Sequence, residues 1–356
     1  MASLKEVKTR INSVQSTRKV TSAMMMVSSA KLHKAQNLIG NMVPYQKRLD
    51  KIVANFLSGE ISVKDSEGRV SKNDSSFESP FVTERPVKKI AIVAFSSNSS
   101  LCGSFNYNII KEFTSAVLEY TGAASKSSVA AAALPSAGEG PLYKLKQEDI
   151  IVFPIGKKIE EAAKKMGFNI QADIPQESTE QPESLLQTLA ATPSYSGIAR
   201  LARKLMKMYA AGEVDKVLVI YHHFKSTAVQ KVERITYLPI DMSEYKRESV
   251  EAGIADENNG GGKSGDKKAG GYLNNYIVEP SAPELIAALI PQVLSQKLYT
   301  ALTDSYASEH AARTMAMQVA TDNADDLIQE LTLQYNKSRQ QSITAELLDI
   351  IGGTMK

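Results

Sequence analysis

The sequence predicts an elongated α/β protein in which long helices from both ends pair as an antiparallel, left-handed coiled coil beside a Rossmann-like α/β domain with a mainly parallel sheet. Heptad-spaced apolar residues run through both ends of the 356-residue chain, and Gly and Pro are nearly absent there. Between the ends the period changes, because short continuous apolar runs alternate with helical stretches. Trp is absent and aromatic residues make up only 6%, so little of the chain can form a thick core.

The first long helix is expected over residues 1–58, where Ser3 followed by Glu6 forms a capping box. Apolar residues then step by three and four, a heptad seam that predicts left-handed supercoiling against a partner helix. Pro44 should bend this helix. The apolar seam positions are Leu4, Val7, Ile11, Val14, Met25, Leu32, Ala35, Ile39, Met42, Leu49, Val53 and Phe56, and polar residues interrupt the seam at Arg18, Thr21, Ser28 and Gln46.

The second long helix is expected over residues 282–356, with neither Pro nor Gly between positions 292 and 350. Pro291 should mark an N-terminal turn or kink, and Gly352 with Gly353 should end the helix. Small and apolar residues again step by three and four, and many are Ala or Ser, which permits close helix approach. Two such stripes most economically cover each other as an antiparallel pair.

The α/β domain is expected over residues 87–245. Buried strands are predicted at 89–95, 150–155 and 216–221, with an edge strand at 229–238, and helices at 105–120, 157–166 and 196–209. Segments 59–86, 123–146 and 246–275 are interpreted as a linker and surface insertions, the last of them Gly-rich and flexible.

Composition and motifs favour a mechanical part over a catalyst. Lys and Arg number 42 against 39 Asp and Glu, a net charge of +3 that is too balanced for general nucleic-acid binding. Residues 260–264 (GGGKS) depart from a phosphate-binding loop, because Glu257 stands at its first glycine position and no strand precedes it. Cys102 is the only cysteine, so an internal disulfide is impossible. No cofactor or catalytic residue is expected.

Single polar residues have ordinary explanations as well as functional ones. Cys102, which follows the strand predicted to end at Phe95, is either a packed side chain or a nucleophile with a neighbouring base. Glu309 and His310, on a helix with Arg313, are interpreted as a polar face. Basic residues are dense on the first helix, either as a solvated face or as a contact for an acidic protein, since aromatics for stacking nucleic-acid bases are missing there. No segment has the apolar length of a membrane span, so a soluble protein is expected.

Several segments then carry a specific resemblance. Residues 3–14 (SLKEVKTRINSV) and 17–32 (TRKVTSAMMMVSSAKL) closely resemble the start of the γ subunit of F-type ATP synthases. Residues 335–340 (YNKSRQ) and 343–353 (ITAELLDIIGG) are similar to the C-terminal signature of that family, and 100–106 (SLCGSFN) to its central segment. Three positions depart from the family pattern: Met25 stands where a charged residue is common, Ser104 replaces the second glycine of the central segment, and Gly353 stands where Ala is usual.

The resemblance implies a non-catalytic rotor shaft. In the family, the paired terminal helices stand inside a hexamer of α and β subunits, and the α/β domain is a foot on the ring of c subunits beside ε. Ions moving through the membrane sector turn the shaft, which drives ATP formation at the β subunits. The implied location is the cytoplasmic face of a bacterial inner membrane, held peripherally by partners. A chloroplast-type thiol switch needs two cysteines in an insertion, and this chain has one.

Seven residues are the rotor–stator contact candidates that the resemblance implies. Those on the first helix should lie near the acidic lever of β, and those on the last helix should form polar contacts between the two shaft helices and the catch region of β. The seven are Arg18, Lys19, Met24, Arg313, Gln340, Thr344 and Glu346. The residues by themselves leave two alternatives open, a static coiled-coil adaptor and an enzyme using the Cys102 turn.

Overall fold

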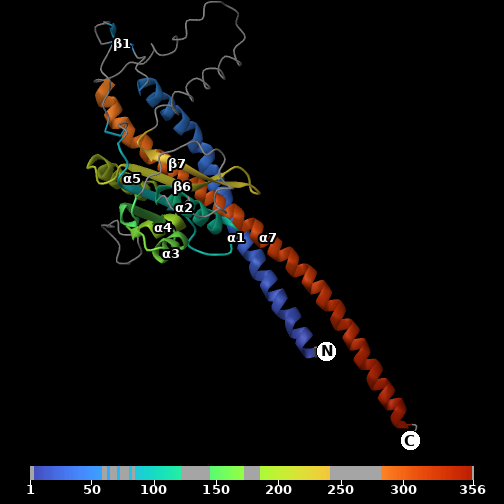
Figure 1. The fold of residues 1–356 in the computed structure, drawn as a ribbon. Coiled ribbons are helices and arrows are strands. Elements are labelled where there is room, and N and C mark those ends of the chain that lie inside the picture. Colours follow the sequence, from blue (N-terminus) through green and yellow to red (C-terminus); the bar gives the residue numbers. More distant parts are fainter. Residues whose placement is uncertain are drawn as a thin grey trace, which may run out of the picture.

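The computed structural model describes residues 4–57, 62–64, 70–72, 80–81, 85–121, 145–171, 185–240 and 282–354. Two long helices, α1 (Leu4–Leu57) and α7 (Ala282–Thr354), run side by side in opposite directions (Figure 1). The strands and shorter helices gather beside one end of this pair, and both termini lie toward the other. The predicted insertion 246–275 and nearly all of 123–146 lie outside the described residues.

The central sheet has five strands in the order β5-β4-β3-β6-β7. The first four are parallel, and β7 pairs antiparallel with β6 at the edge. The predicted strands and the edge strand are therefore confirmed, and the two-residue β5 is an addition. Their bounds are β3 (Ile90–Phe95), β4 (Ile150–Ile155), β5 (Asn169–Ile170), β6 (Lys216–Phe224) and β7 (Gln230–Leu238), and a separate antiparallel pair joins β1 (Ser62–Lys64) to β2 (Val70–Lys72) in the segment 59–86.

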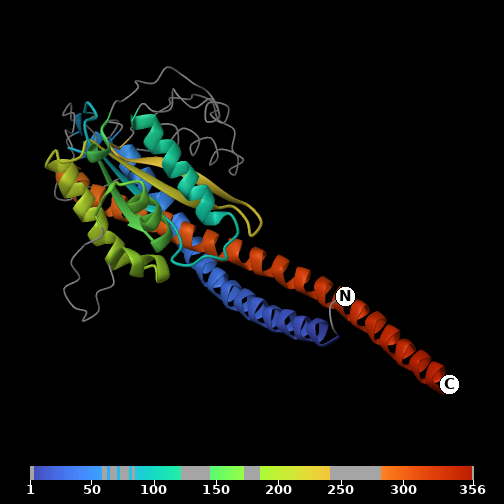
Figure 2. The ribbon, with the colours of Figure 1, turned by 60° about the horizontal axis from the view of Figure 1, so that its bottom comes forward.

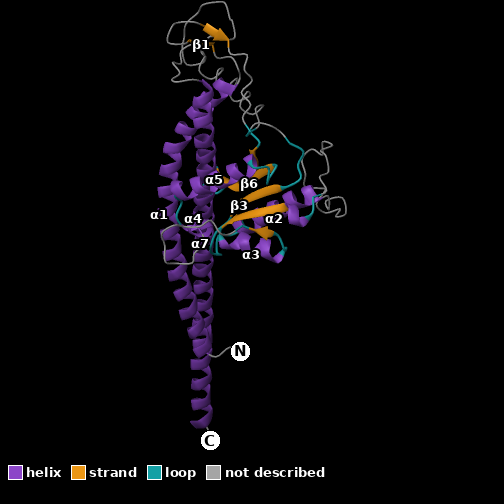
Figure 3. Ribbon diagram, turned by 90° about the vertical axis from the view of Figure 1, so that its left-hand side faces the viewer, coloured by secondary structure: helices purple, strands orange, loops and turns teal. Residues whose placement is uncertain are grey.

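Helices cover both faces of the sheet, which explains why its central strands are continuously apolar. One face packs against α2 (Phe105–Thr121) and α3 (Lys157–Lys165). The other face packs against α4 (Leu185–Ala191), α5 (Tyr195–Ala210) and the early part of α7, through Ile290, Leu294, Leu298 and Leu302. Figures 2 and 3 show the sheet lying between these helical layers, with α7 running along one of them. The α/β unit is thereby packed directly onto the long helical pair.

The last helix begins at Ala282, as expected, and it runs through Pro291. The expected stop at Gly352 and Gly353 is wrong, because the helix continues through both glycines to Thr354. Pro291 is tolerated because the neighbouring Ile290, Val293 and Leu294 are buried, and their packing offsets the loss of one backbone hydrogen bond. A glycine costs a helix about 1 kcal/mol, which is too little to end a helix of 73 residues. Within the described residues, no helix has the length and apolarity needed to cross a membrane.

Candidate functional site on the helical pair and its junction

The helical pair packs along the seam that the heptad pattern predicted. Leu32 and Ala35 of α1 are buried against Ala307 and Ala311 of α7. Three of these four side chains are single methyl groups, so the two backbones can approach closely. Nearer the start of α1, Arg18 pairs with Asp325, which is farther along α7, so the two helices run antiparallel.

Two of the four polar residues that interrupt the seam, Thr21 and Arg18, have partners on the opposite helix. The hydroxyl oxygens of Thr21 and Thr321 lie 2.9 Å apart and share a hydrogen bond across the pair. Nearby, Nε of Arg18 lies 2.5 Å from a carboxylate oxygen of Asp325. Ser28 is buried at a third interruption. The interruptions therefore form a polar stretch of seam, which fixes the register of the two helices because a slipped pairing would bury unpartnered groups.

Met24 and Lys19 lie outside the seam. Lys19 is exposed and Met24 is 39% exposed, while its neighbour Met25 is partly buried. Other large apolar side chains along this middle part of the shaft are also exposed: Val20, Met26 and Val27 of α1 and Met315 and Val319 of α7. Among the candidates on α1, Arg18 contacts α7 through its ion pair with Asp325.

The last part of α7 projects beyond the start of α1 (Figure 1). Leu331 is the last buried residue described on this helix. The candidates Gln340, Thr344 and Glu346 all lie in this projecting tip and are exposed. The Thr344 hydroxyl donates to the backbone oxygen of Gln340 at 2.8 Å. The exposed apolar residues of the tip are Leu333, Ile343, Leu347, Leu348, Ile350 and Ile351.

Arg313 lies far from that tip, at the junction between α7 and the α/β domain. Its Nη1 donates to Oε1 of Glu309 at 2.7 Å, and its Nη2 donates to Oγ of Ser99 at 2.8 Å. The Arg313 side chain is 11% exposed and that of Glu309 10%. Arg313 therefore connects α7 to the turn that follows β3. The interpretation of Glu309, His310 and Arg313 as a polar helix face is wrong, because this part of α7 is covered by the domain.

The turn between β3 and α2 is itself closely hydrogen-bonded. Nδ2 of Asn106 donates to Oγ of Ser97 at 2.8 Å and to Sγ of Cys102 at 3.2 Å. Gly103 adopts a φ of +59° and faces Ala316 of α7. A Cβ added at position 103 would lie 4.0 Å from the Cβ of Ala316. Cys102 is buried in this turn beside Ser97 and Asn106, neither of which is a base. The structure thus favours packing as the role of this cysteine.

Burial dominates the electrostatics of the junction. Burial raises the pKa of Glu309, although the charges of Arg313 and Lys31 oppose the shift. Burial, aided by the same two cations, lowers the pKa of His310 to about 3, so that its imidazole is neutral at pH 7. Burial alone lowers the pKa of His222 to about 4. The junction therefore holds one buried ion pair and two neutral histidines.

The sequence reasoning missed a second contact between the sheet and α7. Nδ1 of His223 lies 2.7 Å from a carboxylate oxygen of Asp304, whose pKa burial raises. The adjacent His222 stacks on the Phe105 ring with centroids 4.1 Å apart, and the Ser308 hydroxyl donates to the His222 backbone oxygen at 3.3 Å. The paired histidines on a strand were visible in the sequence, but nothing there placed Asp304 beside them.

Comparisons with known proteins agree with this architecture. Residues 3–355 match the family profile described as ATP synthase. The chain is 53% identical over 355 residues to a protein named ATP synthase gamma chain from Bacteroides fragilis, with 100% of each chain covered. It is 52% identical over 356 residues to one of that name from Bacteroides thetaiotaomicron, again with 100% of each covered. A chain from the rotor of the Euglena gracilis mitochondrial ATP synthase has the same fold, with a TM-score of 0.51 and 15% identity over 96% of this chain and 98% of that one.

Proposed function

The chain belongs to the ATP synthase γ chain family, and from that premise we propose that it is the central-stalk rotor that couples ion flow through a membrane sector to ATP synthesis. It does so by turning inside a hexamer of α and β subunits. The chain supplies no catalytic residue and no cofactor, since ATP forms at the β subunits. Its own part is to carry torque.

The observation that supports this proposal best is the exposed tip of α7. The tip extends past the start of α1 and exposes Leu348 to 64%, with other apolar residues beside it. Apolar side chains on a projecting helix are suited to a surrounding protein surface. Their single-helix arrangement offers no deep pocket, so a partner can pass along them without locking onto one orientation. A shaft turning in a hexameric bearing needs such a contact.

Six of the seven candidates would contribute to this contact, at two positions along the shaft. Gln340, Thr344 and Glu346 would meet the catch region of β at the tip, and Lys19 and Met24 would meet its acidic lever farther along the shaft. Because exposed ion pairs contribute only about 0 to 1 kcal/mol each, such contacts can be exchanged between successive β subunits. Arg18 would contact the acidic lever of β by giving up its ion pair with Asp325. Arg313 acts indirectly, by holding the foot to the shaft.

The α/β domain would be the foot of the rotor, resting on a ring of c subunits beside ε. We place the complex at the cytoplasmic face of a bacterial inner membrane, with this chain attached peripherally through its partners. Nucleic acid has no part in the proposal. The packing of α7 on the domain supports the assignment, because torque entering the foot reaches the shaft through a continuous core that includes Leu298 and Leu302.

Co-expression with the matching α and β subunits tests the proposal. Native mass spectrometry should show one copy of this chain in a six-subunit ring, and ATP hydrolysis by the purified ring should rise when the chain is present. A variant ending at Thr332, which lacks the tip, should still fold but raise turnover less. Stable association without any change in ATP turnover would instead identify a static adaptor and overturn the proposal.

A further inference from the structure

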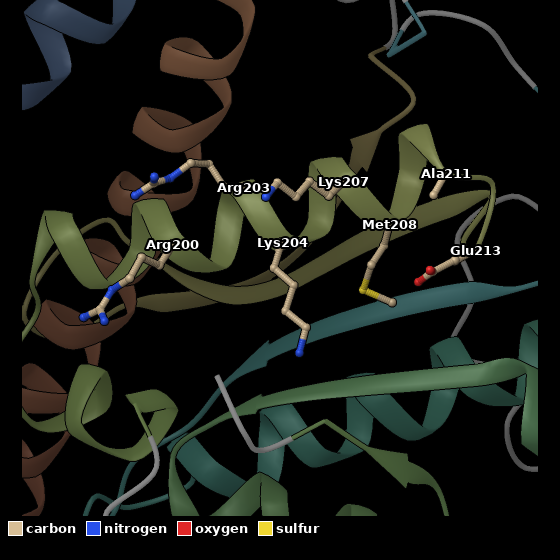
Figure 4. Close-up of a pocket in the computed structure, with 7 residues that line it drawn as sticks. All are labelled: Arg200, Arg203, Lys204, Lys207, Met208, Ala211 and Glu213. Atoms are coloured by element: carbon tan, nitrogen blue, oxygen red, sulfur yellow. The ribbon is translucent and has the colours of Figure 1, made fainter. Parts of the chain in front are cut away.

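A basic groove lies along α5, on the α/β domain and away from the helical pair's seam. Figure 4 shows its lining residues, which surround a volume of about 450 Å³. Four cations line it, and they follow a helical spacing of three, one and three residues that keeps them near one face. The lining consists of Arg200, Arg203, Lys204, Lys207, Met208, Ala211 and Glu213.

Three of the four cations of the groove lack an ion pair within the described part of the chain. The sequence of α5 contains no Asp or Glu. Among the described residues, no carboxylate forms an ion pair with Arg200, Arg203 or Lys207, and the Nε of Arg203 donates only to a backbone oxygen of its own helix. Some surface cations elsewhere on the domain are paired, as Arg234 is with Glu119 at 2.7 Å. The groove therefore has charge that an acidic partner could neutralise.

Lys204 gives the groove a recessed floor. Its ammonium lies 5.5 Å from the centroid of the buried Phe153 ring on β4, and it is partly buried. Lys204 and Met208 extend from α5 toward the strands, as Figure 4 shows. A cation held over an aromatic ring and beside a thioether makes a floor that is both charged and apolar. Such a floor suits a side chain that enters the groove.

We propose that this α5 groove, the surface formed by the seven lining residues, docks an acidic helical segment of a partner protein. From Arg200 to Ala211 the helix spans about 16 Å at 1.5 Å per residue. A partner helix of similar length would present carboxylates at the same three- and four-residue spacing. Glu213 closes one end of the groove and repels anions, so the segment carries an apolar or basic residue there. The flat, uniformly anionic surface of a lipid bilayer fits this recessed and polarised shape less well.

The test uses the full-length chain and a fluorescent helical peptide of about 12 residues with glutamates spaced to face Arg200, Arg203 and Lys207. Fluorescence anisotropy should show binding that weakens as salt is raised, because the pairs are exposed. Arg203→Glu with Lys207→Glu should weaken binding roughly tenfold or more, since two attractions become repulsions. Lys111→Glu with Lys165→Glu is the matched control, because it makes the same charge change on the opposite face of the sheet and should leave binding nearly unchanged.

Three results would overturn the proposal. Equal loss in both double variants would show attraction to overall charge only. If the chain bound vesicles containing phosphatidylserine but not the peptide, and the α5 variant lost this vesicle binding, the groove would be assigned to lipid. The third concerns residues 172–184, which carry four Asp or Glu and no Lys or Arg. If the peptide bound only after these four were changed to Asn or Gln, the chain's own segment would be the occupant. None of these measurements depends on ATP synthesis, so they stand apart from the rotor assignment.

Discussion

Changing Arg313 to Ala should loosen the junction between the shaft and the foot, and the defect should depend on pH. The substitution removes both hydrogen bonds of the guanidinium and leaves the buried carboxylate of Glu309 without its cation. Breaking a buried pair in this way costs about 3 to 5 kcal/mol when the remaining charge stays ionised. Glu309 can instead take up a proton. The smaller of the two costs sets the loss of stability.

The pH dependence follows from the direction of the pKa shift. Burial already raises the pKa of Glu309 in the folded chain above its ordinary value of 4.5, and removal of Arg313 takes away the largest opposing influence. The folded variant therefore binds protons more strongly than the unfolded chain. Its stability is fully present below pH 4.5 and falls as pH rises toward the folded pKa. Protonating Glu309 costs at most about 3 kcal/mol at pH 7 and about 0.7 kcal/mol at pH 5, at ~1.36 kcal/mol per pH unit.

Hydrogen–deuterium exchange of the full chain measures this local stability. Amides in residues 97–106 and 305–316 should exchange roughly 100-fold faster in the Arg313→Ala variant at pH 7, and less than about 10-fold faster at pH 5, after correction for intrinsic rates. A double variant, Arg313→Met with Glu309→Met, should recover most of the protection, because a buried pair can be replaced by apolar residues at little cost. Protection at pH 7 that was unchanged in the single variant would refute the reasoning.

Three further predictions test other parts of the molecule. His222→Phe should stabilise the chain by about 1 to 2 kcal/mol in urea unfolding at pH 7, because it removes two buried ring nitrogens that lack hydrogen-bond partners among the described residues. Because the pKa of His222 is lowered to about 4, its contribution to stability is lost as pH falls from 6.5, and the gain in this variant should grow at pH 5. Ala311→Leu should lower the free energy of unfolding by about 1 to 3 kcal/mol, because it overpacks the seam. Met315→Leu on the exposed surface should leave it nearly unchanged, and thermal unfolding followed by circular dichroism compares the two variants. Glu346→Ala and Arg18→Ala should each change the free energy of unfolding by less than about 1 kcal/mol, yet each should lower ATP synthesis by the assembled complex. Normal ATP synthesis in both variants would show that these two residues are not rotor–stator contacts.

The long helices and the sheet were predictable because they rest on local periodicity. The seam from Val7 to Val53 follows from heptad spacing alone, and the strands Ile90–Phe95 and Ile150–Ile155 follow from continuous apolar runs. The resemblance to the γ subunit family is confirmed by the match over residues 3–355. The C-terminal end of the last helix was less predictable. Gly352 and Gly353 looked like its boundary, but a glycine costs a long helix only about 1 kcal/mol, which is too little to end it.

The sequence by itself determined the antiparallel shaft, the α/β class of the domain and the family. The spacing of apolar residues and the resemblance of successive segments to a family can both be found by comparing residues along the chain, without knowing which distant residues meet. Only the tertiary structure decided where single polar residues lie. It placed Arg313 on Ser99, 214 positions away in sequence, and Asp304 beside His223. It also separated Arg313 from Gln340, although both had been grouped as contacts of the shaft. Contacts between distant segments depend on how the domain packs against α7, and no local pattern records that packing.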